Sequence, residues 1–361
     1  MKPIVFFFLF LFTISTHAQT VVYEQFTVTG TITDAATQQP MAGASVFCQN
    51  TTLGAITNAE GKFVLKVPAG GYDLIISYTS YETQEMRINT ASLAPIAVAL
   101  KLKDKSLAEV AVVGSSEVAD GLVKYGQFFK DNFIGTTSNA KQCTIHNPEA
   151  LQFYFSKKRN RLRVKAKEDL IIVNNALGYK IKFQLDSFSY DYNTNISAYT
   201  GFPFFEQLEG DATQKENWKQ NREEAYAGSR LHFLRSWYDS TLEQEGYVLE
   251  YVDPNSKTLK TTPVKNPYDS SMYAVIENND VEITYGGRLR IIYKEELPDA
   301  NYLSVNKLPA YLKSQITIID VNDGFVIQQN GYFYDQNEVT NTGYWSWEKL
   351  GDALPYDYNP E

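Results

Sequence analysis

The sequence predicts two structural classes in one chain: an N-terminal all-β sandwich, followed by an α+β domain with a mainly antiparallel sheet. Between residues 27 and 102, short β-branched and aromatic runs alternate with turn clusters roughly every eight to twelve residues, which is typical of a small sandwich. Beyond residue 120 the pattern becomes helix, strands, helix, strands. The 25 Tyr and 21 Phe residues favour strands, and 361 residues suffice for two domains.

The predicted sandwich spans residues 26–104, and turn residues separate its strands. Asn58-Ala59-Glu60-Gly61 is predicted to be a hairpin turn in which Gly61 supplies a positive φ. The run Tyr72–Tyr78 is the most apolar of the predicted strands. The full set of predicted strands is 28–33, 44–48, 54–57, 62–67, 72–78 and 96–102.

Three short motifs stand out in this region: Gly30–Asp34 (GTITD), Pro40–Val46 (PMAGASV) and Gly54–Phe63 (GAITNAEGKF). Together they resemble the pattern G-x-V-x-D, P-L-x-G-A-x-V, G-T-x-T-D-x-x-G-x-F of the carboxypeptidase-regulatory-like domain. Asn58 stands where that family usually has Asp, a change that a turn tolerates. The resemblance covers about a fifth of the chain. It implies an immunoglobulin-like or prealbumin-like sandwich used for folding and docking rather than catalysis.

The segment after the sandwich extends the resemblance. Residues 106–114 (SLAEVAVVG) resemble the stretch that follows the same module in TonB-dependent outer-membrane receptors of the polysaccharide-utilisation type. We predict a linker over residues 105–118. Residues 129–136 (FKDNFIGT), 174–181 (NNALGYKI) and the pair GYWSW and DALP at 343–355 resemble a segment of exported Bacteroidota proteins that carry this module. No activity follows from that second resemblance.

The α+β domain is predicted over residues 119–361. A helix is expected over Gly121–Phe133, because apolar residues recur on one face, and Gly135 ends it. A capping box at Thr213–Glu216 predicts one long helix that continues to Gly246. Strands are predicted at 151–155, 161–166, 170–174, 180–190, 197–199, 247–251, 281–285, 289–293, 315–320, 325–328 and 332–334.

The first 18 residues predict export. Lys2 is followed by an apolar run over Ile4–Ile14, and Thr16-His17-Ala18 is a plausible cleavage site. No later apolar run is long enough for a transmembrane helix in the mature chain. We therefore expect secretion across the inner membrane, to the periplasm or the outer membrane. Cys48 and Cys143 fall in different predicted domains and are expected to be buried free thiols.

The charge pattern disfavours nucleic acid as a partner. The formal net charge is −9, and the densest basic run, Lys157–Arg163, is short. We interpret this run as a charged hairpin turn on a solvated face.

One motif suggests a metal site. His146-Asn147-Pro148-Glu149 has the H-x-x-E spacing of zinc carboxypeptidases, and His232 could supply the third ligand. Pro148 favours a different interpretation, in which Asn147 caps a short helix and Pro148 occupies its first turn. The region also lacks the alternating β/α pattern of such enzymes. We therefore expect no metal and no cofactor, with His146, Glu149 and His232 as the alternative zinc set.

An aromatic run suggests a binding surface. Tyr199, Phe202, Phe204 and Phe205 could form an exposed aromatic patch, although core packing is the competing interpretation. Nearby carboxylates at Glu206, Glu209 and Asp211 could act on glycans if paired in space. An acidic loop before a helix explains the same residues.

Taken together, the sequence predicts an exported, non-catalytic binding or scaffolding protein of the cell envelope. The sandwich would be its docking module, and its partner would be an envelope protein or a glycan. Two alternatives stay open: a zinc-dependent carboxypeptidase-like hydrolase and a glycan-binding or glycan-cleaving protein.

Overall fold

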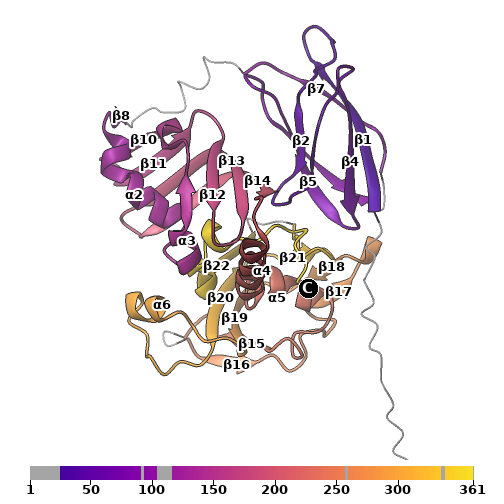
Figure 1. Ribbon diagram of the computed structural model, residues 1–361. Coiled ribbons are helices and arrows are strands. Elements are labelled where there is room, and N and C mark those ends of the chain that lie inside the picture. The colour runs from indigo at the N-terminus through magenta and orange to yellow at the C-terminus, as the bar shows by residue number, and fades with distance from the viewer. Residues whose placement is uncertain (1–24, 91–92, 104–115, 257–258, 335–337, 361) are drawn as a thin grey trace, which may run out of the picture.

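The computed structural model describes residues 25–90, 93–103, 116–256, 259–334 and 338–360, which form three β-rich parts (Figure 1). We call them the sandwich (25–103), the middle unit (116–226) and the C-terminal unit (230–347). Each has its own hydrophobic core. The sheets are mostly antiparallel and helices are few, which confirms the predicted fold class. The predicted signal (1–18) and residues 105–115 of the predicted linker lie outside the described residues.

The sandwich consists of an outer and an inner sheet. The outer sheet has the order β4-β1-β7, from Lys62–Pro68, Gln25–Asp34 and Ile96–Leu100. The inner sheet has the order β3-β2-β5-β6, from Gly54–Ile56, Ser45–Cys48, Gly71–Ser77 and Gln84–Asn89. Among the described strands of the sandwich, β1 and β7 pair in parallel and the other pairs are antiparallel. Apolar side chains of both sheets fill one core, which includes Val28, Ile32, Val46, Leu65, Leu74 and Ile76.

The turn at Asn58–Gly61 forms, but it does not make a hairpin. The Asn58 side chain accepts hydrogen bonds from the amides of Glu60 and Lys62, and Gly61 has φ +69°. The strands on either side, β3 and β4, belong to different sheets. The turn therefore carries the chain from one sheet to the other, which a local turn signal does not distinguish from a hairpin.

The middle unit is a seven-stranded antiparallel sheet covered on one face by helix α2 (Gly121–Phe133) (Figure 1). Strand β13 pairs along one edge with β12 and β11, and along the other with β14 (Ile196–Gln207). The other strands are β8 (Ser116–Glu117), β9 (Cys143–Ile145), β10 (Leu151–Ser156), β11 (Arg161–Ala166), β12 (Leu170–Asn174) and β13 (Tyr179–Asp191). Residues 116 and 117, within the predicted linker, thus join this sheet by pairing with β10. The basic run at Lys157–Arg163 forms the turn between β10 and β11 and the first three residues of β11.

The predicted long helix is two helices. α4 spans Ala212–Tyr226 and α5 spans Arg230–Tyr238, with a break at Gly228, whose φ is +72°. The capping box lies two residues earlier than predicted: Asp211 and Gln214 exchange the two capping hydrogen bonds. A Cβ at Gly228 would clash with Tyr293 and Gln315, so packing fixes the break where helical periodicity alone predicted continuity. No helix in the described part of the chain is both long and apolar enough to cross a membrane.

The C-terminal unit has two sheets packed on α5. One has the order β16-β15-β19-β20-β22, from Thr261–Pro263, Tyr247–Val252, Gly287–Tyr293, Gln315–Val321 and Val339–Gly343. The other has the order β17-β18-β21, from Tyr273–Val275, Val281–Ile283 and Phe325–Ile327. Phe233 and Trp237 of α5 enter their shared core. The predicted strand 332–334 is only an isolated bridge at Phe333. The short helices are α3 (Ser138–Lys141), α6 (Ala300–Val305) and α7 (Tyr344–Trp347).

The sandwich is fixed to the other two parts through its inner sheet. Phe47 of β2 contacts Phe204 of β14, with ring centroids 5.2 Å apart. The amide of Asn50 donates to the Pro203 carbonyl, and Thr51 forms a parallel bridge with Phe204. Toward the C-terminal unit, the Tyr332 hydroxyl donates to Asp73 at 2.5 Å.

Arg87 of β6 strengthens this second contact. Its guanidinium carbon lies 3.2 Å from the ring centroid of Tyr334. Contacts to both neighbouring units make the sandwich part of the molecule's framework rather than an appended module.

Candidate functional site

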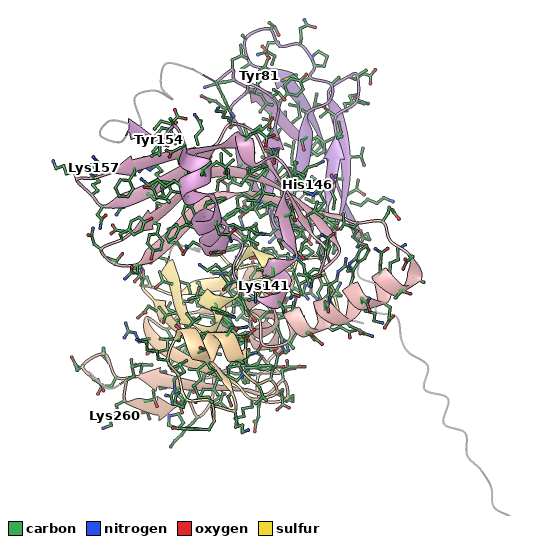
Figure 2. All side chains as sticks on the ribbon, turned by 60° about the vertical axis from the view of Figure 1, so that its left-hand side comes forward. Tyr81, Lys141, His146, Tyr154, Lys157 and Lys260 are labelled. Atoms are coloured by element: carbon green, nitrogen blue, oxygen red, sulfur yellow. The ribbon has the colours of Figure 1, made fainter. Side chains whose placement is uncertain are left out.

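The structure does not bring the three candidate zinc residues together. His146 is exposed directly after β9 (Figure 2). Glu149 lies in a short 3-10 helix, η2 (Pro148–Ala150), which begins with Pro148. His232 is buried in α5, on a different unit. Its Nε2 lies 3.1 Å from Glu245, and its Nδ1 accepts from the Gly228 amide. Among the described residues, no group of three His, Cys, Asp or Glu side chains is placed to hold a metal ion.

The four aromatic residues of the predicted patch lie on β14, where successive side chains point to opposite faces of the sheet. They therefore lie in three different environments. Odd-numbered residues face α2, so Phe205 is buried in the core of the middle unit and Tyr199 packs on Phe133. Even-numbered residues face the sandwich, where Phe202 and Phe204 line a cleft of about 200 Å³. The four side chains therefore do not form one surface.

The cleft beside Phe202 and Phe204 lies between β14 and the inner sheet of the sandwich. Phe47 and Ile56 supply its apolar wall from the sandwich side. The Glu206 carboxylate forms ion pairs with Lys180 and Lys182, which accounts for one acid of the predicted carboxylate cluster.

The other two acids of that cluster have no shared site. Glu209 is exposed, and Asp211 is the N-cap of α4. The acidic residues near 206–211 are therefore explained by an ion pair and a helix cap.

A cavity of about 350 Å³ lies where the three parts meet. Asn50 comes from the sandwich, Tyr199 from β14, Ser229 and Arg230 from the start of α5, and Trp345 from α7. Such a volume is in the range of small-molecule sites. The lining also includes Asn132, Ser197, Asn341, Ser346, Glu348, Lys349, Asp352, Ala353, Leu354 and Tyr356.

The chain segment after α7 closes this cavity. Its Leu350 enters the core of the middle unit, and the Tyr356 amide donates to the Asn50 carbonyl at 2.7 Å. The Thr52 amide donates to Asp357 at 2.8 Å.

Arg235 of α5 holds the same segment from the other side. Its guanidinium donates to the carbonyls of Tyr356 and Tyr358 at 2.9 and 2.8 Å, and to that of Asn330 at 3.1 Å. One segment thus links the sandwich, the middle unit and the C-terminal unit around the cavity.

Two carboxyl groups at the cavity have raised pKa values. Burial raises the pKa of Asp352 to about 6, even though Thr137 and Asn139 donate to this carboxylate at 2.8 to 3.1 Å. Burial, with the nearby Asp352 carboxylate, raises the pKa of Glu348 well above its usual value. The Lys349 ammonium donates to the Asn132 carbonyl at 3.0 Å, and burial lowers the pKa of Lys349.

The cavity wall also carries a cation and two phenols. Arg230 is exposed to solvent at the first turn of α5, and among the described residues it has no carboxylate within ion-pair distance. Burial raises the pKa of Tyr356, and a hydrogen bond with Arg230 opposes that rise. Tyr199 keeps 42% of its surface accessible, and the charge of Arg230 likewise opposes the rise of its pKa.

Sequence reasoning missed this cavity as a site, although it marked part of its wall. The motifs at 343–347 and 352–355, noted above only for a resemblance, supply Trp345, Ser346, Asp352, Ala353 and Leu354. Arg230 and Tyr356 gave no signal, because their proximity depends on the fold.

Comparison with known proteins identifies the N-terminal part. The family model "CarboxypepD_reg-like domain" matches residues 28–113. The TonB-dependent receptor SusC of Bacteroides thetaiotaomicron is 32% identical over 118 residues, which are 33% of this chain and 10% of that receptor. A TonB-dependent receptor of Formosa agariphila is 25% identical over 158 residues, 42% of this chain and 14% of the receptor. The chain thus matches only about a tenth to a seventh of these relatives' length.

Among solved structures, a cohesin–X-dockerin complex of Acetivibrio cellulolyticus matches 26% of this chain and 78% of its own chain, with 22% identity and a TM-score of 0.21. The family assignment therefore rests on the sequence matches. The N-terminal part of this chain, residues 28–113, is a carboxypeptidase-regulatory-like domain, and the chain is similar in sequence to a part of TonB-dependent receptors of Bacteroidota.

Proposed function

We propose that this protein is a non-catalytic binding protein of the cell envelope, whose ligand occupies the cavity where the three parts meet. The observation that carries the proposal is that side chains from all three parts line this one cavity. Its wall mixes aromatic rings, hydroxyls and amides, which suits a small polar ligand such as a short glycan. The predicted export signal and the receptor relatives support the envelope location.

The chemistry of the cavity favours binding over hydrolysis. Glycoside hydrolysis generally uses two carboxyl groups that both reach the scissile bond. Asp352 already accepts hydrogen bonds from Thr137 and Asn139, which leaves Glu348 as the carboxyl of this wall that accepts no side-chain hydrogen bond from the described residues. Glycan cleavage is therefore an outcome to be tested and not the expected one.

We propose that the sandwich contacts its partner through the outer sheet. The inner sheet is occupied by Phe204 and Tyr332 of the other units. The outer face of β4 presents Lys62, Val64 and Lys66 to solvent. A photo-crosslinking residue at position 64 should link to an envelope protein in intact cells, whereas one at position 75 should link only within the chain. Links from position 75 to another protein would contradict this assignment.

The ligand-binding role can be tested by narrowing the cavity. Ser197→Trp fills the wall from β14, and Ile196→Trp, one residue away on the opposite face, is the matched control. A panel of short glycans would be screened with the mature chain by native mass spectrometry. We expect a bound species that Ser197→Trp removes and Ile196→Trp keeps, with no cleaved product. Binding that survives Ser197→Trp, or release of cleaved sugar, would overturn the proposal.

A further inference from the structure

The wall of the cavity carries both carboxyl groups and a guanidinium, and this combination restricts the ligand. Glu348 and Asp352 supply the carboxyl groups. Arg230 supplies the guanidinium, and its charge acts on the phenols of Tyr199 and Tyr356, which line the same cavity. A ligand with one anionic group and several neutral, hydrogen-bonding groups would match both.

Arg230 is the cation of the cavity wall that has no carboxylate or carbonyl partner among the described residues. Lys349 donates to the Asn132 carbonyl, and Arg235, outside the lining, donates to three carbonyls. Arg230 hydrogen-bonds to the Tyr356 phenol, and its guanidinium carbon lies 5.5 Å from the ring centroid of Phe333. A planar guanidinium beside two phenolic hydroxyls is suited to bidentate binding of a carboxylate.

The two acids select for hydroxyl groups of the ligand. A carboxylate placed beside Glu348 and Asp352 would make their ionisation more costly, whereas hydroxyl groups can hydrogen-bond to either acid. Ser197, Asn341 and Ser346 add further short polar groups to the wall. The aromatic faces of Tyr199 and Trp345 can cover the apolar face of a ring.

We infer that the cavity binds a sugar acid, with its carboxylate on Arg230 and its hydroxyl groups toward Glu348. This inference rests on the proposed function and adds the ligand class. It makes Arg230 the residue that distinguishes acidic from neutral sugars.

Isothermal titration calorimetry on the mature chain tests the inference with D-galacturonate, D-galactose and acetate as probes. D-galacturonate should bind most tightly. D-galactose lacks the carboxylate and acetate lacks the hydroxyls, so each should bind at least tenfold more weakly. Arg230→Gln should weaken galacturonate binding tenfold or more and leave galactose binding unchanged. Lys157→Gln, which removes the same charge at the β10–β11 turn, should leave both unchanged (Figure 2).

The outcomes separate the two claims. If galactose binds as tightly as galacturonate, or if Arg230→Gln has no effect, the sugar-acid inference fails and the proposed binding function stands. If no sugar, acidic or neutral, binds at millimolar concentration, both fail. Arg230→Lys keeps the charge without the planar fork, so an intermediate loss supports bidentate binding. Circular dichroism and thermal unfolding of each variant would confirm that the fold is intact.

Discussion

The outer and inner sheets of the sandwich share one core, but their second faces differ. Strand β4 of the outer sheet alternates strictly: Phe63, Leu65 and Val67 are buried, and Lys62, Val64 and Lys66 are exposed. Strands β2 and β5 of the inner sheet are buried on both faces. The comparison teaches that a continuous apolar run in a small sandwich marks a sheet covered by another part of the protein.

Ile75 shows how the second face is used. Leu74 and Ile76 point into the sandwich core, so Ile75 must point the opposite way, and yet it is 0% exposed. It lies opposite Phe47 across the β2–β5 pair, and Phe47 contacts Phe204 of the middle unit. The inner sheet therefore has a second packing surface, directed at the rest of the chain.

Shortening a side chain on this second packing surface should have the largest effect on stability. Ile75→Ala should lower the free energy of unfolding by about 2–5 kcal/mol, as for other buried large-to-small changes. Val64→Ala, on the outer sheet at 64% exposure, should change it by less than about 0.5 kcal/mol. Urea unfolding monitored by tryptophan fluorescence measures both. Equal effects at the two positions would mean that the inner face is not packed in solution.

The next effect concerns the segment that joins the three parts. Arg235→Ala removes three charge-assisted hydrogen bonds to the carbonyls of residues 330, 356 and 358, and should cost about 2–3 kcal/mol. The segment should also become sensitive to limited proteolysis near residue 356. Arg159→Ala, at an exposed turn, is the control with the same change in charge. An Arg235→Ala protein that resists cleavage as well as the native chain would argue against the linking role.

A matched pair of tyrosines compares two hydrogen bonds to carboxylates at different depths. The buried Tyr332 donates to Asp73 in the inner-sheet interface, and the half-buried Tyr81 donates to Asp34 on the sandwich surface, both at 2.5 Å. Tyr332→Phe leaves the partly buried Asp73 carboxylate with Arg87, 3.8 Å away, as its charged partner, and should cost about 1–2 kcal/mol. Tyr81→Phe should cost less, because water replaces the donor. If Tyr81→Phe lowered the free energy of unfolding more than Tyr332→Phe, the expected order of the two hydrogen bonds would be wrong.

The same surface pair predicts a pH dependence. The Tyr81 hydroxyl is the main cause that lowers the pKa of Asp34 from 3.8 to about 2. A carboxyl with a lowered folded-state pKa stabilises the fold above its unfolded pKa, and this contribution is lost as pH falls toward 2. Tyr81→Phe should therefore reduce stability above about pH 4 and flatten the loss between pH 4 and 2, while Val64→Ala leaves the slope unchanged. Acid unfolding curves of the two variants measure this difference.

Much of the fold could be predicted from local patterns. The helix Gly121–Phe133 has the predicted bounds, and both cysteines are free and buried as predicted. The break at Gly228 was missed because helical periodicity continues across it, whereas Gly228 has φ +72° and the Ser229 side chain caps α5. The sheet membership of β3 and β4 was missed because a local turn signal does not show which sheet each strand joins.

The site was harder to predict than the fold. Its residues come from segments as distant as Asn50, Tyr199, Arg230 and Glu348, and no local spacing relates them. The aromatic hypothesis rested on residues close in sequence, which the alternation of β14 then separated. The zinc hypothesis joined the local motif at His146 and Glu149 to the distant His232, which is buried in another unit. The apolar run Tyr72–Tyr78 was the one usable signal that the sandwich has a covered face.

The central claim is that the inner sheet of the sandwich packs on the middle unit, and a double-mutant cycle on Phe47 and Phe204 tests it most directly. Phe47→Ala, Phe204→Ala and the double variant would be unfolded in urea. We predict a coupling energy of about 0.5–1.5 kcal/mol, because the two rings contact across this interface. A coupling energy indistinguishable from zero, with both single variants stable and folded, would contradict the account.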